Sequence, residues 1–352
     1  MQKDAYAQHK QREAMAVHVL WMAGGLGCDG ESVAITSATS PSLEDLLGQS
    51  LPGTPRIILH SPLLAYQVGD EFMQAWYDAE SGRLDPFILV LEGALGNERI
   101  NGDGHWSGFG TSPETGQPIP VNDWIDRLAP KAGAVIAMGT CATYGGVPAM
   151  KNNPTGAMGL PDYLGWSWKT SAGLPIVCVP GCPAQPDNMT EVLLRVAVHL
   201  SGSGPAPELD AQLRPTWLFG RTTRESCNRA GFTEQGNFAT EYGSDPRCLV
   251  KLGCKGPVAK CNVPTRGWVA GVGGCPNVGG ICIACTMPGF PDKFTPFMEP
   301  DRWGNTAANV QRFTYGPIFR YFRQRNLAKH FEREPEWRQP DARLTSGYEQ
   351  RW

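Results

Sequence analysis

Short, nearly continuous apolar runs recur between residues 17 and 200, and segments with helical spacing separate them. Apolar runs of this kind are typical of strands in a parallel sheet that is buried on both faces. The predicted strands are residues 18–22, 56–60, 86–92, 134–138 and 175–179. The predicted helices are residues 42–47, 63–80, 121–128 and 188–200. This alternation predicts an open, doubly wound α/β domain with its site at the carboxyl ends of the strands.

The pattern changes after a Gly/Ser/Pro-rich linker at residues 201–207. Residues 208–300 have few periodic segments but many glycines, prolines and cysteines, and bound metal clusters can replace a hydrophobic core in such a stretch. We therefore expect four segments: a polar segment 1–16, an α/β domain 17–200, a cluster-binding domain 201–300 and an extension 301–352. The extension is polar and Arg-rich, with helical spacing over 309–323, and we expect it at subunit interfaces.

Composition narrows the class of protein. A chain of 352 residues suits two domains or one large one, and a net charge of −3 gives no indication of nucleic-acid binding. No apolar run reaches the ~20 residues of a membrane span, and the polar N-terminus has no secretory pattern, so we expect a cytoplasmic protein. An odd count of 11 cysteines in such a chain argues against a disulfide scaffold and favours metal binding or buried thiols.

A first set of cysteines follows the predicted strands. Cys28, Cys141 and Cys182 come directly after the first, fourth and fifth strands, so they should meet at one edge of the sheet. Three thiolates can hold an iron–sulfur cluster, but a cubane takes four ligands, and Asp29 is the neighbouring candidate for the fourth. Asp29 could instead cap the following helix.

The same loop also allows a different interpretation. Gly25, Gly27 and Gly30 match the G-x-G-x-x-G pattern of dinucleotide-binding loops, which would make the chain a Rossmann-type NAD-dependent oxidoreductase. A dinucleotide has no need of the three thiols, so the cluster is the favoured hypothesis.

A second set lies within the loop-rich stretch: Cys227, Cys248, Cys254, Cys261, Cys275, Cys282 and Cys285. Seven cysteines divide as four plus three, which suits one [4Fe-4S] cluster and a second centre that is a [3Fe-4S] core or has a ligand other than cysteine. The last four could instead form a zinc site in a scaffold protein, although zinc sites usually contain two short CxxC pairs and only one is present. Cys178, inside the fifth strand, is interpreted as core.

Several motifs give the chain a family resemblance. They are GTCATYGG at 139–146, VPGCP at 179–183, LGCKGP at 252–257, and CIAC at 282–285 followed by FTPF at 294–297. With these motifs the chain resembles the small, electron-transferring subunit of [NiFe] hydrogenases. Its Cys28–Asp29 pair is similar to that of the actinobacterial-type, high-affinity, oxygen-tolerant uptake enzymes.

The resemblance implies a flavodoxin-like domain with a proximal cluster and a C-terminal domain with medial and distal clusters. It implies a large subunit that carries the nickel–iron site, so this chain should relay electrons and hold no catalytic residue itself. A higher assembly of heterodimers is expected, with an acceptor protein or a quinone-linked partner.

Ligands follow by position. The proximal ligands would be Cys28, Cys141, Cys182 and Asp29, with Glu31 as the alternative because it occupies the place of the family's second loop cysteine. The medial [4Fe-4S] ligands would be Cys261, Cys275, Cys282 and Cys285; many members have proline at the second of these positions. The distal [4Fe-4S] or [3Fe-4S] centre would have Cys227, Cys248 and Cys254. Its usual histidine is replaced by Arg224, which offers iron no lone pair, so the fourth distal ligand stays open.

Overall fold

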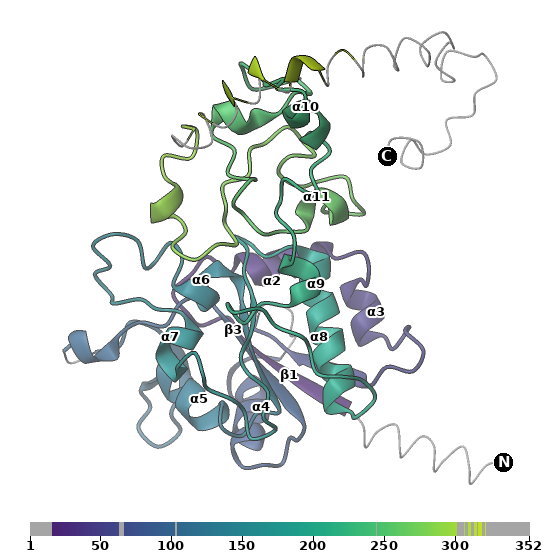
Figure 1. Ribbon diagram of the computed structural model, residues 1–352. Coiled ribbons are helices and arrows are strands. Elements are labelled where there is room, and N and C mark those ends of the chain that lie inside the picture. Colours follow the sequence, from purple (N-terminus) through teal and green to yellow (C-terminus); the bar gives the residue numbers. More distant parts are fainter. Residues whose placement is uncertain are drawn as a thin grey trace, which may run out of the picture.

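A five-stranded parallel sheet organises the first part of the chain (Figure 1). The computed structural model describes residues 16–62, 67–102, 104–243 and 245–300, with a few positions between 306 and 321. The strands are β1 Ala16–Met22, β2 Arg56–His60, β3 Phe87–Glu92, β6 Ala134–Met138 and β7 Val177–Val179, in the order β2-β1-β3-β6-β7. This is the flavodoxin-like order, so the predicted fold class is confirmed.

Helices cover both faces of this sheet. One face packs against α4 (Gly69–Glu80) and α5 (Val121–Leu128), whose Trp76 and Trp124 are fully buried with ring centroids 5.9 Å apart. The other face packs against α2 (Gly30–Ala34), α3 (Leu43–Leu47) and α8 (Pro186–Leu200). Each large apolar side chain buried there stabilises the fold by about 1.5–3 kcal/mol.

Several short elements were not predicted. The hairpin β4 (Gly108–Thr111) and β5 (Pro118–Pro120) is too short to show a period, and so are α2 and α6 (Gly139–Tyr144). The predicted helix 63–80 appears as α4 from residue 69, and residues 63–66 lie outside the described chain. The predicted helix 42–47 appears as α3 with Ser42 as its N-cap, where Ser42 and Asp45 form a capping box.

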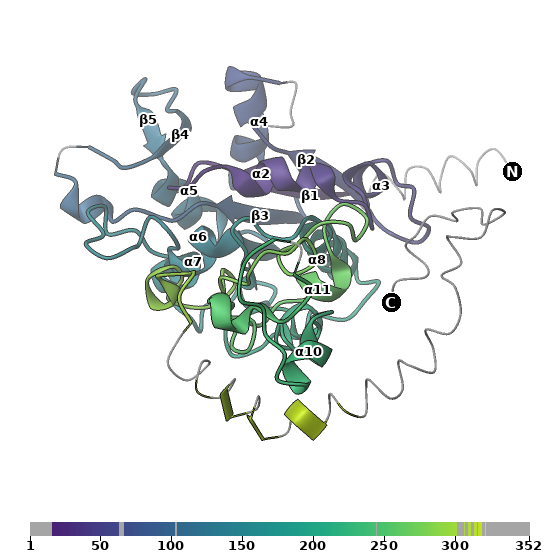
Figure 2. The same cartoon turned by 90° about the horizontal axis from the view of Figure 1, so that it is seen from above.

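The rest of the described chain is loop-rich and lies over the carboxyl ends of the strands, above α2 and α6 (Figures 1 and 2). Between residues 208 and 300 its helices are short: α9 Thr216–Phe219, α10 Ala230–Glu234, η3 Leu249–Leu252, α11 Val263–Arg266 and η4 Asp292–Phe294. The other short elements are η1 Ile35–Ser37, η2 Glu98–Ile100 and α7 Leu160–Leu164. The segment boundaries stay predictions, and most of the predicted helix 309–323 lies outside the described residues.

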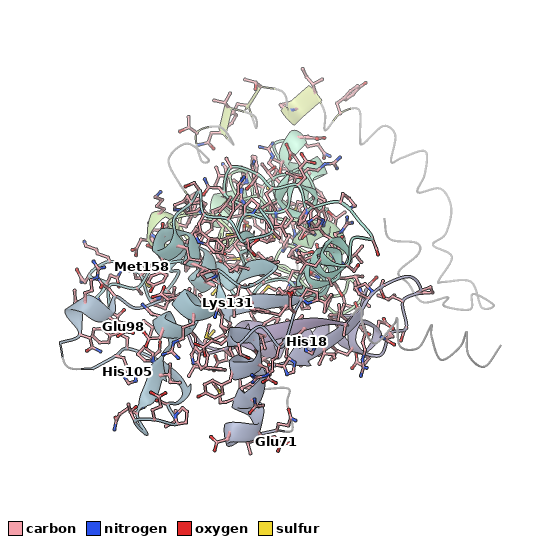
Figure 3. The ribbon with its side chains drawn as sticks, turned by 90° about the horizontal axis from the view of Figure 1, so that it is seen from below. His18, Glu71, Glu98, His105, Lys131 and Met158 are labelled. Carbon is pink, nitrogen blue, oxygen red and sulfur yellow. The ribbon has the colours of Figure 1, made fainter. Side chains whose placement is uncertain are left out.

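The opposite, lower side carries polar groups away from the cysteines (Figure 3). There Lys131 donates a hydrogen bond to the Glu80 carbonyl at 2.6 Å. His18 of β1 stacks on His60 of β2, with ring nitrogens 3.0 Å apart. Among the described helices, none combines the length and the apolar character needed to cross a membrane.

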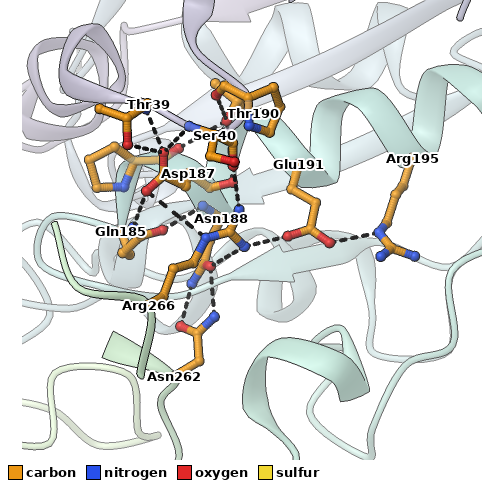
Figure 4. A network of polar contacts seen from close by, with 12 residues as sticks. Thr39, Ser40, Gln185, Asp187, Asn188, Thr190, Glu191, Arg195, Asn262 and Arg266 are labelled. Carbon is orange, nitrogen blue, oxygen red and sulfur yellow. Dashed lines mark hydrogen bonds and ion pairs between the residues drawn. The ribbon is translucent and has the colours of Figure 1, made fainter. Parts of the chain in front are cut away.

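A polar network joins the two parts of the chain (Figure 4). Asp187 at the start of α8 accepts hydrogen bonds from the Thr39 and Ser40 amides at 2.5 and 2.8 Å. Arg266 of the loop-rich part donates to the Ser40 carbonyl at 2.7 Å and pairs with Glu191. These contacts fix the loop-rich part over the sheet.

Candidate metal-cluster sites

The first cysteine set converges at the carboxyl edge of the sheet. Cys28 lies in the loop after β1, Cys141 in α6 directly after β6, and Cys182 in the loop after β7. Burial raises the pKa of the Cys141 thiol to about 12. The nearby acidic groups of Cys28, Cys182 and Glu31 raise it as well, so these four side chains lie together.

The two carboxylates of the first loop differ in placement. Asp29 is exposed, has a left-handed backbone with φ 53°, and its side chain makes no capping hydrogen bond to α2. Glu31 in the first turn of α2 is only 7% exposed. Burial and the charge of Glu92 raise the pKa of Glu31 to about 8. Glu31 is therefore the carboxylate that the fold directs toward Cys141 and Cys182.

Glu92 fixes this loop from the end of β3. Its carboxylate is 1% exposed and accepts hydrogen bonds from the Trp21 indole at 2.7 Å and from the Glu31 and Ser32 amides at 2.9 and 3.0 Å. The Ser32 hydroxyl also donates to it. A carboxylate at a helix N-terminus satisfies free amides and the helix dipole. Sequence reasoning missed Glu92, although an acidic residue closing a fully buried strand is a usable signal.

The glycines of the first loop are explained by packing against the chain itself. A Cβ at Gly25 would lie 2.5 Å from the Glu92 carbonyl oxygen, and one at Gly27 would lie 3.1 Å from the Cα of Gly93. A Cβ at Gly30 would lie 3.1 Å from the Cys28 sulfur. These glycines thus admit the backbone after β3 and the Cys28 thiol, and no dinucleotide is needed to account for them.

Four cysteines of the second set line one cavity. It measures about 120 Å³, and its walls include Cys261, Cys275, Cys282 and Cys285, together with Cys182 of the first set. Burial raises the pKa of the Cys261 thiol to about 12, opposed by the amides of Val263 and Asn262. Burial also raises the pKa of the Cys285 thiol strongly, and the amide of Cys182 opposes it.

The remaining three cysteines line a smaller cavity of about 30 Å³, formed by Cys227, Cys248 and Cys254 with Arg224, Arg229 and Thr233 among its other walls. The Arg229 amide donates to the Cys227 sulfur at 3.4 Å. No histidine is among the lining residues.

Two other polar side chains lie near this smaller cavity without lining it. The Glu225 carboxylate accepts a hydrogen bond from the Thr222 amide at 2.7 Å, and the Asn228 side-chain oxygen lies 3.8 Å from the Cys227 sulfur.

The donor chemistry of these sites fits iron–sulfur clusters. Thiols meet in three groups, and backbone amides face several of the sulfurs, as they do around protein-bound clusters. Within the described ranges, no three or more His, Cys, Asp or Glu side chains are close enough together to hold a single metal ion. A cluster of several irons separates its ligands further than one ion does. Cys178 is fully buried in β7, apart from the three groups.

Comparisons with known proteins identify the family. Residues 219–298 match the family that describes the C-terminal part of the NiFe/NiFeSe hydrogenase small subunit, and residues 28–196 match "NADH ubiquinone oxidoreductase, 20 Kd subunit". The periplasmic [NiFeSe] hydrogenase small subunit of Desulfomicrobium baculatum is 30% identical over 284 residues, covering 79% of this chain and 86% of that protein. The chain belongs to the small subunits of [NiFe] hydrogenases.

Two further relatives extend the match for this hydrogenase small subunit. The periplasmic [NiFe] hydrogenase small subunit 1 of Nitratidesulfovibrio vulgaris is 32% identical over 281 residues, or 77% of this chain and 79% of that protein. The solved actinobacterial-type NiFe-hydrogenase from Ralstonia eutropha H16 is 57% identical, with a TM-score of 0.86 over 95% of this chain and 96% of that chain.

Membership of the family settles the functional class. The protein is the electron-transferring small subunit of a hydrogenase complex and pairs with a large subunit. The NAD-dependent oxidoreductase and the zinc scaffold, which the sequence left as alternatives, are therefore set aside.

Proposed function

We propose that this small subunit holds three iron–sulfur clusters and relays electrons from H2, oxidised at the nickel–iron site of its large subunit, to an acceptor. The proximal ligands are Cys28, Cys141, Cys182 and one carboxylate of the first loop. The medial ligands are Cys261, Cys275, Cys282 and Cys285, and the distal ones are Cys227, Cys248 and Cys254. Clusters bound at these sites would supply one-electron redox chemistry.

For the proximal carboxylate, the placement of the side chains favours Glu31 over Asp29. The charge of Glu31 raises the pKa of the Cys141 and Cys182 thiols, whereas Asp29 is not among the groups that shift the pKa of either thiol. Exposure does not separate the two carboxylates, because Cys28 and Cys182 are exposed like Asp29. Glu92 supports this arrangement, because it holds the Glu31 amide at 2.9 Å and so sets the direction of the first turn of α2.

One observation carries the relay: the three cysteine groups contact each other in sequence. The Cys182 amide faces the Cys285 thiol, which links the proximal and medial groups. The Cys282 amide donates to the Cys254 sulfur at 3.3 Å, which links the medial and distal groups. Both links are backbone to ligand, so the chain itself determines how close the neighbouring sites are.

Exposed apolar side chains indicate where the large subunit binds. Val33 on α2 is 64% exposed and Val147, just after α6, is 49% exposed, at the edge that carries Cys28 and Cys141. Exposed apolar groups next to a functional site favour a protein interface. We propose that this edge faces the large subunit, and we expect Val147→Asp to weaken pairing in size-exclusion chromatography while Val278→Asp, elsewhere on the surface, leaves it unchanged.

The test of the ligand sets uses the complex purified with its large subunit under anaerobic conditions. We expect iron and acid-labile sulfide for three clusters, and Mössbauer and EPR spectra that lose one set of signals in Cys285→Ala but keep all of them in Cys178→Ala. Glu31→Gln should alter the proximal signals and Asp29→Asn should not. Zinc without labile sulfide, or unchanged spectra in Cys285→Ala, would refute the proposal.

Physiological properties are proposed on the resemblance to the actinobacterial-type enzyme. We infer a cytoplasmic, oxygen-tolerant uptake hydrogenase that forms a higher assembly of heterodimers and reduces an acceptor protein or a quinone-linked partner. H2 oxidation that persists under air, and a mass above one heterodimer in analytical ultracentrifugation, are the expected results. Loss of turnover under air would contradict the oxygen tolerance.

A further inference from the structure

Thr140, next to Cys141, connects three of the loops that carry cysteines. Its side chain is 1% exposed, and its hydroxyl donates to the Cys285 carbonyl at 2.5 Å. The same hydroxyl accepts from the Gly181 amide at 2.9 Å, and the Thr140 amide donates to the Gly181 carbonyl at 2.8 Å. One residue therefore fixes the backbone on both sides of the junction between the proximal and medial groups.

This arrangement places the Cys182 amide. Residue 182 follows Gly181 directly, and Gly181, Cys182 and Cys285 line the same cavity. The Cys182 amide opposes the rise in the pKa of the Cys285 thiol, as an N–H directed at the sulfur does. Hydrogen bonds from backbone amides to ligand sulfur stabilise the more negative, reduced form of a cluster and so raise its reduction potential. The strength of this contact depends on the two peptide groups that Thr140 holds.

We propose that Thr140 is a positioning residue that sets the reduction potential of the medial cluster through the Cys182 amide. The inference rests on the proposed role of Cys285 as a medial ligand. It makes the medial potential dependent on a loop that belongs to the proximal site, so the two sites are coupled through hydrogen bonds as well as through space.

The test is potentiometric titration of the intact complex, with each cluster followed by EPR. In Thr140→Val we expect unchanged iron content and a medial potential below that of the wild type, while Thr140→Ser keeps the wild-type value. Thr143→Val is the matched control, because the Thr143 hydroxyl is also buried but donates to the Gly139 carbonyl at 2.8 Å within its own helix.

An unchanged medial potential in Thr140→Val overturns the inference. If Thr140→Val loses iron, the result for Thr140→Ser decides. Wild-type iron content and medial potential in Thr140→Ser support the inference, whereas loss of iron in Thr140→Ser overturns it. Failure of the proposed function looks different, because a wild-type complex without a medial signal dependent on Cys285 would show it directly.

A separate observation concerns the distal group. Thr233 of α10 is 4% exposed and lines the cavity formed by Cys227, Cys248 and Cys254. Its hydroxyl has no hydrogen-bond partner among the described residues. Leaving a buried hydroxyl unpaired costs about 1–3 kcal/mol, so a partner in that cavity is expected.

We infer that the Thr233 hydroxyl donates a hydrogen bond to a sulfur of the cluster bound at the distal site. This also rests on the proposed ligand set. It gives the distal site a polar contact in addition to its three cysteines, in a cavity where Arg224, in place of histidine, provides no ligand.

Thr233→Val tests this inference in the same titration. We expect the distal potential to fall, with the distal iron retained, and Thr233→Ser to restore the wild-type value. An unchanged distal potential would overturn it. So would loss of a distal iron in Thr233→Val that Thr233→Ser prevents, because that result would make the hydroxyl a ligand. A wild type without a distal signal would instead count against the proposed ligand set.

Discussion

Asp187 gives the most direct test of how residues 39–40 are held against the start of α8. Its carboxylate is 3% exposed and accepts hydrogen bonds from the Thr39 amide at 2.5 Å, the Ser40 amide at 2.8 Å and the Gln185 side chain at 2.8 Å. Arg266 approaches the same carboxylate at 4.0 Å. Asp187→Ala removes the acceptor shared by these groups, and with it the bonds of the Thr39 and Ser40 amides, while Arg266 still donates to the Ser40 carbonyl.

The size of the effect follows from these bonds. A hydrogen bond to a charged group contributes about 1.5–3 kcal/mol. Ser40 is exposed, so water can replace part of the hydrogen bonding that the two amides lose with the carboxylate. The lower value, about 1.5 kcal/mol, therefore applies to each bond. Two such bonds give about 3 kcal/mol for local opening. At 1.4 kcal/mol per factor of ten, opening becomes about a hundredfold more frequent.

Hydrogen exchange on the intact complex measures this opening. The reporters are the amides of Leu46 and Gly48, whose bonds to Ser42 and Glu44 lie within α3 and its caps and are not removed by the substitution. Arg195→Gln is the control, because it breaks the i,i+4 pair between the 56% exposed Arg195 side chain and Glu191, which is worth about 0.3–0.5 kcal/mol. Wild-type exchange of Leu46 and Gly48 in Asp187→Ala would refute the reasoning.

Three further predictions concern other parts of the chain. Burial lowers the pKa of His18, and burial with the charge of His18 lowers the pKa of His60 to about 4, so the folded state loses stability as pH falls from 6.5 toward 4. The Tm of the wild type relative to His60→Gln should therefore decline over that range; a constant difference would contradict it. Cys178→Ala should lower the free energy of unfolding by about 1–2 kcal/mol, seen as a slightly lower Tm, with unchanged cluster potentials. Gly25→Ala should sharply reduce the yield of folded complex, because its Cβ would meet the Glu92 carbonyl oxygen at 2.5 Å. Gly104→Ala is the control, because a Cβ there would have no contact shorter than 3.4 Å.

The strands could be predicted because their signal is local. A strand buried on both faces needs an apolar residue at nearly every position, and β2 and β6 match the predicted ranges 56–60 and 134–138. The short helices α2 and α6 could not be predicted from a period. Their ends depend on distant groups, as when Glu92 receives the first amides of α2.

For the site, position along the strands predicted which thiols meet, since parallel strands place their carboxyl ends at one edge. The positions of the strands cannot distinguish Asp29 from Glu31 as the proximal ligand, because that choice depends on the direction of each side chain. The left-handed backbone of Asp29 leaves its side chain exposed, and the helical turn that follows carries Glu31 inward. Adjacency to Cys28 in the sequence favours Asp29 and the placement of the side chains favours Glu31, so the identity of the ligand stays a prediction.

The cavity around Cys261 and Cys285 has walls from both parts of the chain, including Cys182, Gln185 and Asn188. The two parts of the chain therefore cannot be exchanged between relatives by cutting at the linker, residues 201–207. A hybrid small subunit that takes its C-terminal part from another family member must take residues 180–188 from the same parent. We expect sequence changes in residues 180–188 to occur together with changes in the segment from Cys261 to Cys285, although more than seventy positions separate the two segments.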